Sequence, residues 1–200
     1  MQDCTLVVLG AGSSSRFEHK AKKQWLRIED IPLWLLTTNR LKKYADFKKI
    51  IVVGHKDEIN YMKNYSNQLE FVEGGDSRQE SMSNALNVVD SKFVMVTDVA
   101  RCCVPQDVIN ELFENKDNAD CIVPVLSVSD TVVYQDETIN RDDVKLIQTP
   151  QLSNTDVLKE ALKTSTEFTD DSSAIKISGG TVFYTKGSIK SSKLTFGDEL

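Results

Sequence analysis

A loop of small residues follows the first apolar run of the chain and could bind phosphate. The run Thr5–Leu9 leads directly into Gly10-Ala11-Gly12-Ser13-Ser14-Ser15-Arg16. Small residues let backbone N–H groups approach a phosphate without a side chain in the way, and an arginine at the end of the loop adds a fork of donors. An ordinary turn after a strand remains the alternative for this segment taken alone.

Two other phosphate-binding motifs fit this loop less well. A dinucleotide-binding fingerprint needs a third glycine where Ser15 stands. A P-loop ends in Gly-Lys-Ser or Gly-Lys-Thr, and the loop lacks that ending. A dinucleotide-binding oxidoreductase therefore remains a weaker alternative, which a test of NAD(P)H binding by fluorescence would decide.

A cluster of positive charge follows the loop. Between Arg16 and Arg27 the chain has five basic residues and one acidic residue, although the net charge of the whole chain is −6. A basic cluster beside a loop of small residues is suited to a triphosphate. The negative charge of the whole chain argues against a general binder of nucleic acid or of anionic membranes.

Two further segments place polar groups at the ends of structural elements. Gly75 and Asp76 form a turn that leads into a helix N-terminus, where backbone amides and the Ser81 hydroxyl could contact one edge of a ligand. Asp98 ends the apolar run Phe93–Thr97, and a buried carboxylate is costly unless it is paired or bound to a metal. We therefore expect Asp98 to bind Mg²⁺, with a polar cap at the strand end as the alternative.

Short apolar runs rich in β-branched residues alternate with amphipathic stretches along the chain. Continuous apolar runs predict strands covered on both faces, and the stretches between them predict helices. The alternation predicts an α/β fold with a mostly parallel, three-layer sheet, in which ligands bind at the carboxyl ends of the strands. The expected strands are Thr5–Leu9, Lys49–Val53, Glu70–Val72, Phe93–Thr97 and Cys121–Val125, and the expected helices are Asp76–Val89, Pro105–Asn115, Thr155–Leu162 and one that begins near Thr169.

One segment breaks this alternation. Two expected strands, Thr131–Tyr134 and Lys145–Ile147, are joined by the polar stretch Gln135–Asp143. This pattern predicts a projecting β-arm at about residues 127–147, on a single domain that spans residues 1–200. The last residues, Asp198–Leu200, are typical of the first turn of a helix. We therefore expect that a C-terminal helix is missing, or that the chain is the front part of a longer protein.

The composition of the chain also indicates the cellular compartment in which we expect the protein. No apolar run approaches the length needed to span a bilayer, and the first residues lack the basic region of a signal peptide, so we expect a cytoplasmic location without membrane contact. The two histidines, His19 and His55, lack the spacing of zinc ligands. The four cysteines contain no Cys-x-x-Cys pair and are expected to be free thiols in a reducing compartment. They are Cys4, Cys102, Cys103 and Cys121.

The motifs together resemble those of the 2-C-methyl-D-erythritol 4-phosphate cytidylyltransferases, a nucleotidyltransferase family with a Rossmann-like fold. Leu9–Phe17 and Lys22–Trp25 are similar to the family's Ala-Ala-Gly-x-Gly-x-Arg-Met and Pro-Lys-Gln-Tyr segments, with Ser14 in place of a glycine and Lys22 in place of the proline. Further likenesses follow in the family's order: Val72–Ser81, Val96–Arg101, Ser129–Thr131, Asn140-Arg141, Thr149–Gln151, Thr169–Ala174 and Lys193–Leu200. The run Thr169–Ala174 is interpreted chiefly as a helix cap.

The resemblance implies a site assembled from both ends of the chain. In that site, three basic residues would be catalytic, Asp98 would bind Mg²⁺ or another divalent cation, and the β-arm would reach across the interface of a homodimer. The implied catalytic residues are Arg16, Lys23 and Lys193; those that bind CTP are Gly10, Ala11, Gly12, Gly75, Asp76 and Ser81; those that bind the acceptor are Arg101, Thr131, Arg141 and Thr149.

The implied reaction is transfer of CMP from CTP to 2-C-methyl-D-erythritol 4-phosphate, with release of pyrophosphate, in non-mevalonate isoprenoid precursor synthesis. The implied partners are CTP, a small sugar-alcohol phosphate and a second copy of the chain. Two alternatives stay open: the same chemistry on ribitol 5-phosphate, and a non-catalytic nucleotide-binding regulator. In some bacteria this domain is fused to the cyclodiphosphate synthase of the same pathway, so the front part of such a bifunctional enzyme is a further expectation.

Overall fold

A computed structural model describes residues 2–14, 17, 21–164 and 166–195 of the chain. Its central sheet has the strand order β10-β7-β11-β6-β1-β4-β5, and β12 also pairs with β7. Four of the strand pairs are parallel, namely β1–β4, β1–β6, β4–β5 and β7–β12, so the prediction of a mostly parallel sheet is confirmed. The strands of this sheet are β1 (Gln2–Leu9), β4 (Phe47–Gly54), β5 (Glu70–Glu73), β6 (Phe93–Asp98), β7 (Cys121–Ser127), β10 (Lys145–Ile147), β11 (Gln151–Asn154) and β12 (Val182–Lys186).

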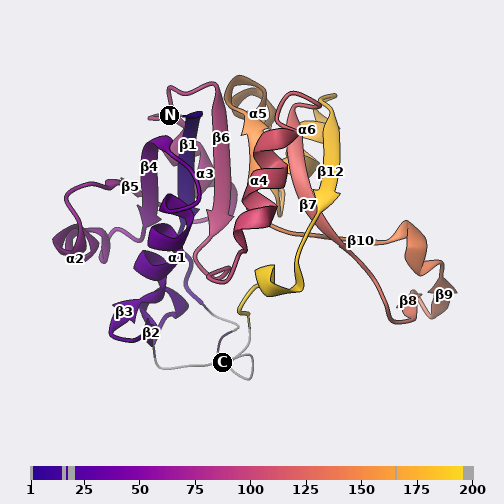
Figure 1. Ribbon diagram of the computed structural model, residues 1–200, viewed down its shortest axis with the longest axis horizontal. Helices are drawn as coiled ribbons and strands as arrows, with labels where there is room; N and C mark the ends of the chain where they lie inside the picture. Colours follow the sequence, from indigo (N-terminus) through magenta and orange to yellow (C-terminus); the bar gives the residue numbers. More distant parts are fainter. Residues whose placement is uncertain (1, 15–16, 18–20, 165, 196–200) are drawn as a thin grey trace.

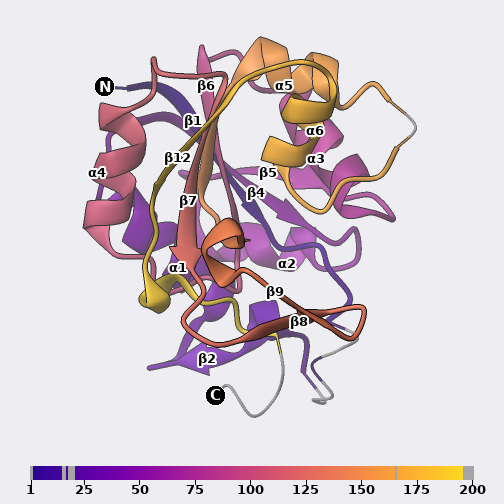
Figure 2. The same ribbon diagram turned by 90° about the vertical axis from the view of Figure 1, so that its right-hand side faces the viewer.

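Helices cover both faces of the sheet, as Figure 2 shows. One buried cluster joins the sheet to α1 (Leu33–Lys42) and α4 (Gln106–Glu114), and it contains Trp34 and Leu112. The other cluster joins the opposite face to helices that contribute Leu86, Leu158 and Ile175. Because each face buries its own apolar cluster, the strands are apolar along both faces, as their continuous runs indicate. The helices of the second face are α3 (Arg78–Leu86), α5 (Thr155–Ala161) and α6 (Asp171–Ile177), and a short α2 (Ile59–Met62) packs near β4 and β5.

The predicted helices form close to the expected residues because their caps are local. The Ser77 hydroxyl accepts a hydrogen bond from the Glu80 N–H at the start of α3, and Asn154 accepts from the Asp156 and Val157 N–H groups at the start of α5. In α4 the buried stripe is Val108, Ile109 and Leu112, at helical spacing. Pro105 is the N-cap of that helix rather than a residue of its first turn.

Strand β11 was not among the predicted elements. Its sequence, Gln-Leu-Ser-Asn, lacks an apolar run, yet it lies antiparallel between β6 and β7. The buried polar side chains have partners there: the Gln151 side-chain oxygen accepts from the Ser172 N–H at 2.9 Å, and the Ser153 hydroxyl donates to the Cys121 sulfur at 3.3 Å. Contacts with residues distant in the sequence therefore stabilise this strand, and local pattern cannot predict it.

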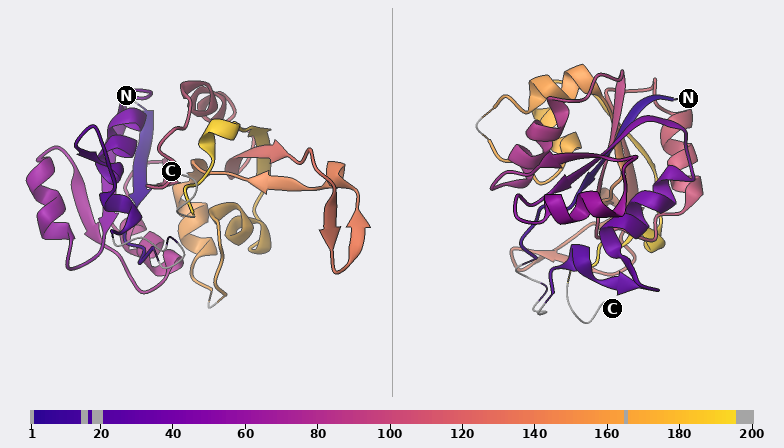
Figure 3. Two further views of the ribbon diagram at one scale, coloured as in Figure 1. Left: turned by 90° about the horizontal axis from the view of Figure 1, so that it is seen from below. Right: turned by 90° about the vertical axis from the view of Figure 1, so that its left-hand side faces the viewer.

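The predicted β-arm exists, but its strands pair differently. β8 (Val132–Tyr134) pairs with β9 (Glu137–Ile139), and the two-residue turn between them has positive φ angles at Gln135 and Asp136. This hairpin projects from the body of the molecule (Figure 3). β10 pairs with β7 in the central sheet, so the expectation that Lys145–Ile147 is the returning strand of the arm is wrong.

Two expectations concern the ends of the chain and its surroundings. The helical turn expected at Asp198–Leu200 lies outside the described residues. In the part of the chain that the structure describes, no helix combines the length and apolar character that crossing a membrane requires.

Candidate functional site

A cavity of about 540 Å³ lies at the carboxyl ends of the central strands. Its wall includes Leu9 at the end of β1, Asp98 at the end of β6 and His55 just after β4. In Figure 1 these strands run downward, and the last described residues of the chain pass beneath them. The cavity therefore occupies the edge of the sheet where ligands of this fold class bind.

The structure brings most of the predicted site residues together around this cavity. They come from both ends of the chain and from the middle, and the three charged side chains predicted to act on phosphates, Lys23, Asp98 and Lys193, are all in its wall. Arg16 lies outside the described residues. The predicted residues that line the cavity are Gly10, Ala11, Gly12, Lys23, Gly75, Asp76, Ser81, Asp98 and Lys193.

The loop of small residues is held against the sheet and leaves space beside its backbone. The Gly10 N–H donates to the Val53 carbonyl at 2.8 Å, and a Cβ on Gly10 would lie 3.0 Å from the Val99 side chain. A Cβ on Gly12 would meet no atom within 4 Å, although Gly12 lines the cavity. The open space beside Gly12 is where an anionic group can approach the backbone closely.

Ser14 has a left-handed backbone conformation, with φ at 59°. That region favours glycine, so a serine there carries some strain. Its hydroxyl compensates by joining two segments: it accepts from the Lys23 N–H at 3.1 Å and donates to the Gln24 side-chain oxygen at 3.3 Å. The residue that departs from the glycine pattern thus ties the loop to the lysine-bearing segment.

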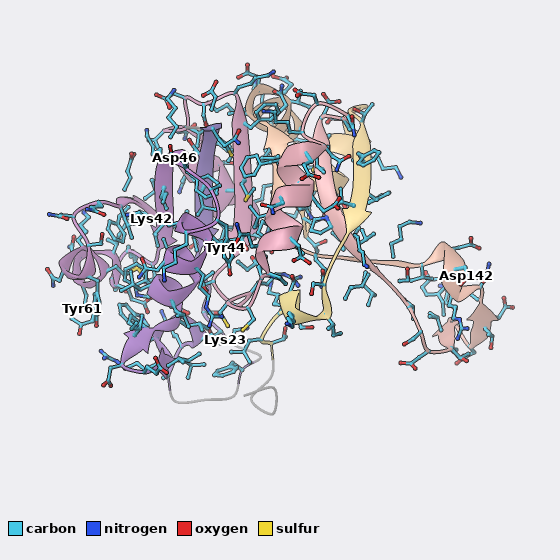
Figure 4. All side chains as sticks on the ribbon, in the orientation of Figure 1. Lys23, Lys42, Tyr44, Asp46, Tyr61 and Asp142 are labelled. Atoms are coloured by element: carbon cyan, nitrogen blue, oxygen red, sulfur yellow. The ribbon has the colours of Figure 1, made fainter. Side chains whose placement is uncertain are left out.

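Lys23 lies beside the C-terminal segment, as Figure 4 shows at the base of the sheet. Its ammonium group donates to the Leu194 carbonyl at 3.1 Å, and the Leu194 N–H donates to the Ala100 carbonyl at 3.0 Å. These two hydrogen bonds hold the segment that carries Lys193 between Lys23 and the end of β6. The two lysines predicted to be catalytic are therefore neighbours in space.

Asp98 is the acidic group at the centre of this arrangement. Its side chain is 14% exposed, with one oxygen 2.9 Å from the Lys193 ammonium and the other 3.9 Å from Nε of Arg78. Burial alone raises the pKa of Asp98, but the charges of Lys193 and Arg78 outweigh burial and hold that pKa below its usual range. Asp98 is therefore a carboxylate at neutral pH.

Arg78, which lines the cavity, and its ion-pair partner Asp171 were not among the predicted site residues. Nη1 of Arg78 lies 2.9 Å from an oxygen of Asp171, whose side chain is 1% exposed. Asp170, next in the chain, is the N-cap of α6, so the expected helix cap is confirmed, but its neighbour has a different role. The signals in the sequence were the two consecutive aspartates, where one suffices for capping, and the position of both residues in motifs that resemble the family.

The cap residue Asp170 is expected to make stability depend on acid pH. Burial raises its pKa, but hydrogen bonds from the Ser172 and Ser173 hydroxyls and the Ser173 N–H outweigh burial and hold that pKa below its usual range. Stability from this group is present above the pKa of the unfolded chain, near 4, and is lost as pH falls through the lower folded pKa.

The variant Asp170→Asn keeps a capping side chain but does not titrate. We expect its free energy of unfolding, measured by urea denaturation from pH 7 to pH 2.5, to fall less steeply in acid than that of the parent chain. Parallel profiles for the two proteins would contradict this explanation.

The four predicted acceptor-binding residues do not line the cavity within one chain. Arg101 is half-buried near Asp98 and donates to the Ser191 carbonyl, and the Thr149 hydroxyl lies 3.5 Å from that of Thr97. Thr131 and Arg141 are exposed on the β-arm. Their assignment to an acceptor remains a prediction.

The donor set can be tested for a divalent cation. Among the described residues, no three His, Cys, Asp or Glu side chains lie close enough together to hold a metal ion. Mg²⁺, however, is commonly bound through one or two carboxylates together with substrate phosphates. Asp98 fits that mode, because it is an ionised carboxylate in the wall of a cavity that basic side chains also line.

Comparison with known proteins gives consistent matches. A model of the family described as "IspD: 2-C-methyl-D-erythritol 4-phosphate cytidylyltransferase" matches residues 4–200. The chain is 60% identical over its full length to a bifunctional enzyme IspD/IspF from Aliarcobacter butzleri (strain RM4018), and 52% identical to one from Campylobacter fetus subsp. fetus (strain 82-40). It covers 54% and 53% of these two proteins, so the chain spans about half the length of the curated relatives it matches.

Comparison with solved structures identifies the same family. The structure of the bifunctional IspDF from Campylobacter jejuni superposes with a TM-score of 0.94 at 48% sequence identity, over 98% of this chain and 53% of that one. The 2-C-methyl-D-erythritol 4-phosphate cytidylyltransferase of Francisella tularensis superposes with a TM-score of 0.79 at 27% identity, over 98% of this chain and 95% of that one.

Proposed function

Because the chain belongs to the 2-C-methyl-D-erythritol 4-phosphate cytidylyltransferase family, we propose that it transfers the cytidylyl group of CTP to 2-C-methyl-D-erythritol 4-phosphate and releases pyrophosphate. The reaction serves isoprenoid precursor synthesis. The observation that carries this proposal is the convergence of Lys23, Lys193 and Asp98 on one cavity beside a loop of small residues. That cavity combines positive charge with backbone exposed to a ligand, as a nucleoside triphosphate requires.

The reaction depends more on positioning the two substrate phosphates than on a general base. An oxygen of the acceptor's phosphate attacks the α-phosphorus of CTP, a new phosphorus–oxygen bond forms, and the bond to the β-phosphate breaks, so that pyrophosphate leaves with its electron pair. An ionised phosphate is already a competent nucleophile. The chain therefore acts by orienting the two phosphates and neutralising charge. Lys23 and Lys193 suit this role because they are neighbours in the wall of the cavity.

The glycine turn before α3 has a shape suited to the edge of a base. The Gly75 N–H donates to the Ser81 hydroxyl at 3.1 Å, and the Asp76 N–H donates to the Glu80 carboxylate at 2.7 Å. A Cβ on Gly75 would lie 2.2 Å from Cγ of Glu80, so a larger residue would displace the Glu80 side chain from the Asp76 N–H. We assign recognition of cytosine to Gly75, Asp76 and Ser81, all of which line the cavity.

We assign a divalent cation, with Mg²⁺ as the first choice, to Asp98. When bound, the cation neutralises triphosphate charge, and the role of the chain is to present one carboxylate that Lys193 and Arg78 orient. The variant Asp98→Asn is expected to raise the Mg²⁺ concentration that gives half-maximal pyrophosphate release by at least about tenfold. Asp90→Asn, which alters a surface carboxylate paired with Lys48, is the control and is expected to leave it unchanged. An unchanged Mg²⁺ requirement in Asp98→Asn would remove Asp98 as the ligand.

We assign the β-arm to a homodimer in which Thr131 and Arg141 reach the acceptor of the partner chain. The support is that both residues are exposed on a hairpin that also exposes Val133 and Tyr134. Sedimentation at micromolar concentration is expected to give the mass of two chains. A monomer under conditions that support activity would contradict the assignment.

The whole protein is proposed to be bifunctional, because relatives that are 48–60% identical carry the name IspD/IspF and are about twice as long as this chain. Its second activity would be that of the cyclodiphosphate synthase. The mass of the native protein tests this proposal.

The proposed reaction is tested by pyrophosphate release with CTP, Mg²⁺ and a panel of acceptors. We expect release with 2-C-methyl-D-erythritol 4-phosphate and little with ribitol 5-phosphate or without an acceptor. Faster turnover of ribitol 5-phosphate would reassign the acceptor. CTP binding without any pyrophosphate release would indicate a regulator instead of an enzyme.

A further inference from the structure

Gln24 connects the lysine-bearing segment to the loop of small residues. Its side chain is 2% exposed, and its amide nitrogen donates to the Gly12 carbonyl at 3.3 Å and to the Glu58 carboxylate at 3.1 Å. Its oxygen accepts from the Ser14 hydroxyl. Besides the Gly12 carbonyl, the amide nitrogen of Gln24 needs a second hydrogen-bond acceptor to keep this orientation, and the Glu58 carboxylate is that acceptor.

Glu58 contacts the residues around Lys23 without being placed to contact its ammonium group. One oxygen lies 2.7 Å from the Lys22 ammonium, the other accepts from Gln24, and the Trp25 side chain also donates to this carboxylate. The Lys23 ammonium points instead to the Leu194 carbonyl. Burial raises the pKa of Glu58, but the hydrogen bonds from Lys22, Gln24 and Trp25 outweigh burial and keep that pKa below its usual range.

We propose that Glu58 is a positioning residue for catalysis: it fixes the backbone of Lys22–Trp25 from outside the cavity, so that Lys23 is presented to the triphosphate. The proposal rests on the proposed function. It assigns a role to a carboxylate that is not among the residues lining the cavity.

The conformation of Lys22 offers a way to separate this role from a merely structural one. Lys22 has φ −64° and ψ 144°, the values that proline adopts. In the described part of the chain, no hydrogen bond from the Lys22 N–H is found. Proline at this position would therefore hold the same backbone covalently, without the ion pair to Glu58.

The test compares Glu58→Gln with the double variant Lys22→Pro/Glu58→Gln. The first change keeps the side-chain shape but removes the charge that holds Lys22, and we expect kcat/KM for CTP to fall by about tenfold or more. The second is expected to recover most of that loss. Glu70→Gln is the matched control, because it removes an ion pair with Lys49 at 3.3 Å on another part of the sheet. Its kcat/KM for CTP is expected to equal that of the parent chain.

Hydrogen–deuterium exchange of the peptide that covers residues 21–26 gives a readout independent of activity. Faster exchange in Glu58→Gln, reversed by the added proline, would support the proposal even if the acceptor assignment failed. Wild-type kcat/KM in Glu58→Gln, or a loss that the proline does not recover, would overturn it. Absence of pyrophosphate release in the parent chain would overturn the proposed function and leave the exchange result to decide the role of Glu58.

A separate feature, the adjacent thiols Cys102 and Cys103, lies in the turn after β6. Their sulfur atoms are 3.7 Å apart, and Cys103 is exposed. Nη1 of Arg40 donates to the Cys102 carbonyl at 2.7 Å and to the Cys103 sulfur at 3.3 Å, so both residues are held by one guanidinium. The other two cysteines, Cys4 and Cys121, are buried.

We propose that this pair is a dithiol site for trivalent arsenicals. An arsenoxide, R–As=O, condenses with two thiols: two arsenic–sulfur bonds form, the arsenic–oxygen bond breaks, and the oxygen leaves as water with both thiol protons. No oxidant or reductant is needed. The two sulfurs lie 3.7 Å apart, close enough for a single arsenic atom to bind both, and Arg40 holds the Cys103 sulfur and the Cys102 backbone.

Intact mass spectrometry of the folded chain with phenylarsine oxide tests this site. We expect one adduct per chain that survives excess 2-mercaptoethanol and is removed by 2,3-dimercaptopropanol. Cys102→Ser and Cys103→Ser should each lose the resistant adduct, whereas Cys4→Ser should keep it. A resistant adduct in either pair variant, or none in the parent chain, would contradict the proposal.

Discussion

Replacing Lys23 with alanine is expected to lower kcat for pyrophosphate release by about 10²–10³-fold, with the fold intact. Its ammonium group is held in the cavity wall by the Leu194 carbonyl and would face charge that develops as pyrophosphate leaves. Loss of one such donor typically removes roughly 3–4 kcal/mol of transition-state stabilisation. Steady-state kinetics with saturating CTP and acceptor measure the effect, and urea unfolding checks that the fold is retained.

Lys42→Ala is the matched control for Lys23→Ala. Lys42 is at the end of α1, away from the cavity, and its ammonium bonds the Gln68 side chain at 2.8 Å (Figure 4). Its removal is expected to leave kcat within about twofold of the parent value, because long-range surface charge is screened by salt. Near-parent turnover in Lys23→Ala would exclude the proposed role of this lysine.

Replacing Arg78 with methionine is expected to lower the free energy of unfolding by about 3–5 kcal/mol. The reason is Asp171, which is buried and has Arg78 as its ion-pair partner at 2.9 Å. Burial already raises the pKa of Asp171 despite that partner, and without Arg78 the carboxyl must either remain an uncompensated charge or take up a proton. Urea denaturation at pH 7 measures the loss.

The double variant Arg78→Met/Asp171→Asn separates the ion pair from packing. Because it removes the buried charge as well as its partner, we expect it to be more stable than Arg78→Met alone. Arg27→Met is the surface control, since Arg27 is exposed and its guanidinium bonds the hydroxyl of Tyr65 and the Asp30 carbonyl, and its loss is expected to cost less than about 1 kcal/mol. If Arg78→Met unfolds at the same urea concentration as the parent chain, the ion pair does not stabilise the fold.

The sequence predicted the parts of the fold that depend on local pattern. Apolar runs identified β1, β4, β5, β6 and β7 within a few residues, because a parallel sheet covered by helices needs continuous apolar strands. β11 and the pairing of β10 were not predicted: β11 is largely polar, and the strands that pair with β10 and β11 lie elsewhere in the chain.

The residues of the candidate site also fall into two groups, those that local motifs predicted and those that only the folded chain reveals. Lys23, Asp98 and Lys193 were predicted because they follow recognisable motifs, and the cavity brings them together. Glu58 and Asp171 were not, because each acts through a partner distant in the sequence: Glu58 is 34 residues from Gln24, and Asp171 is 93 residues from Arg78. Neither carboxylate has a motif of its own, so only the folded chain reveals what it contacts.

A crystal structure of the chain soaked or grown with CTP and Mg²⁺ tests the convergence of Lys23, Lys193 and Asp98 most directly. We expect the triphosphate to lie in the cavity between Gly12 and the two lysines, with the cation between a phosphate and Asp98. A nucleotide bound elsewhere on the chain, or one whose phosphates contact neither lysine, would contradict the account.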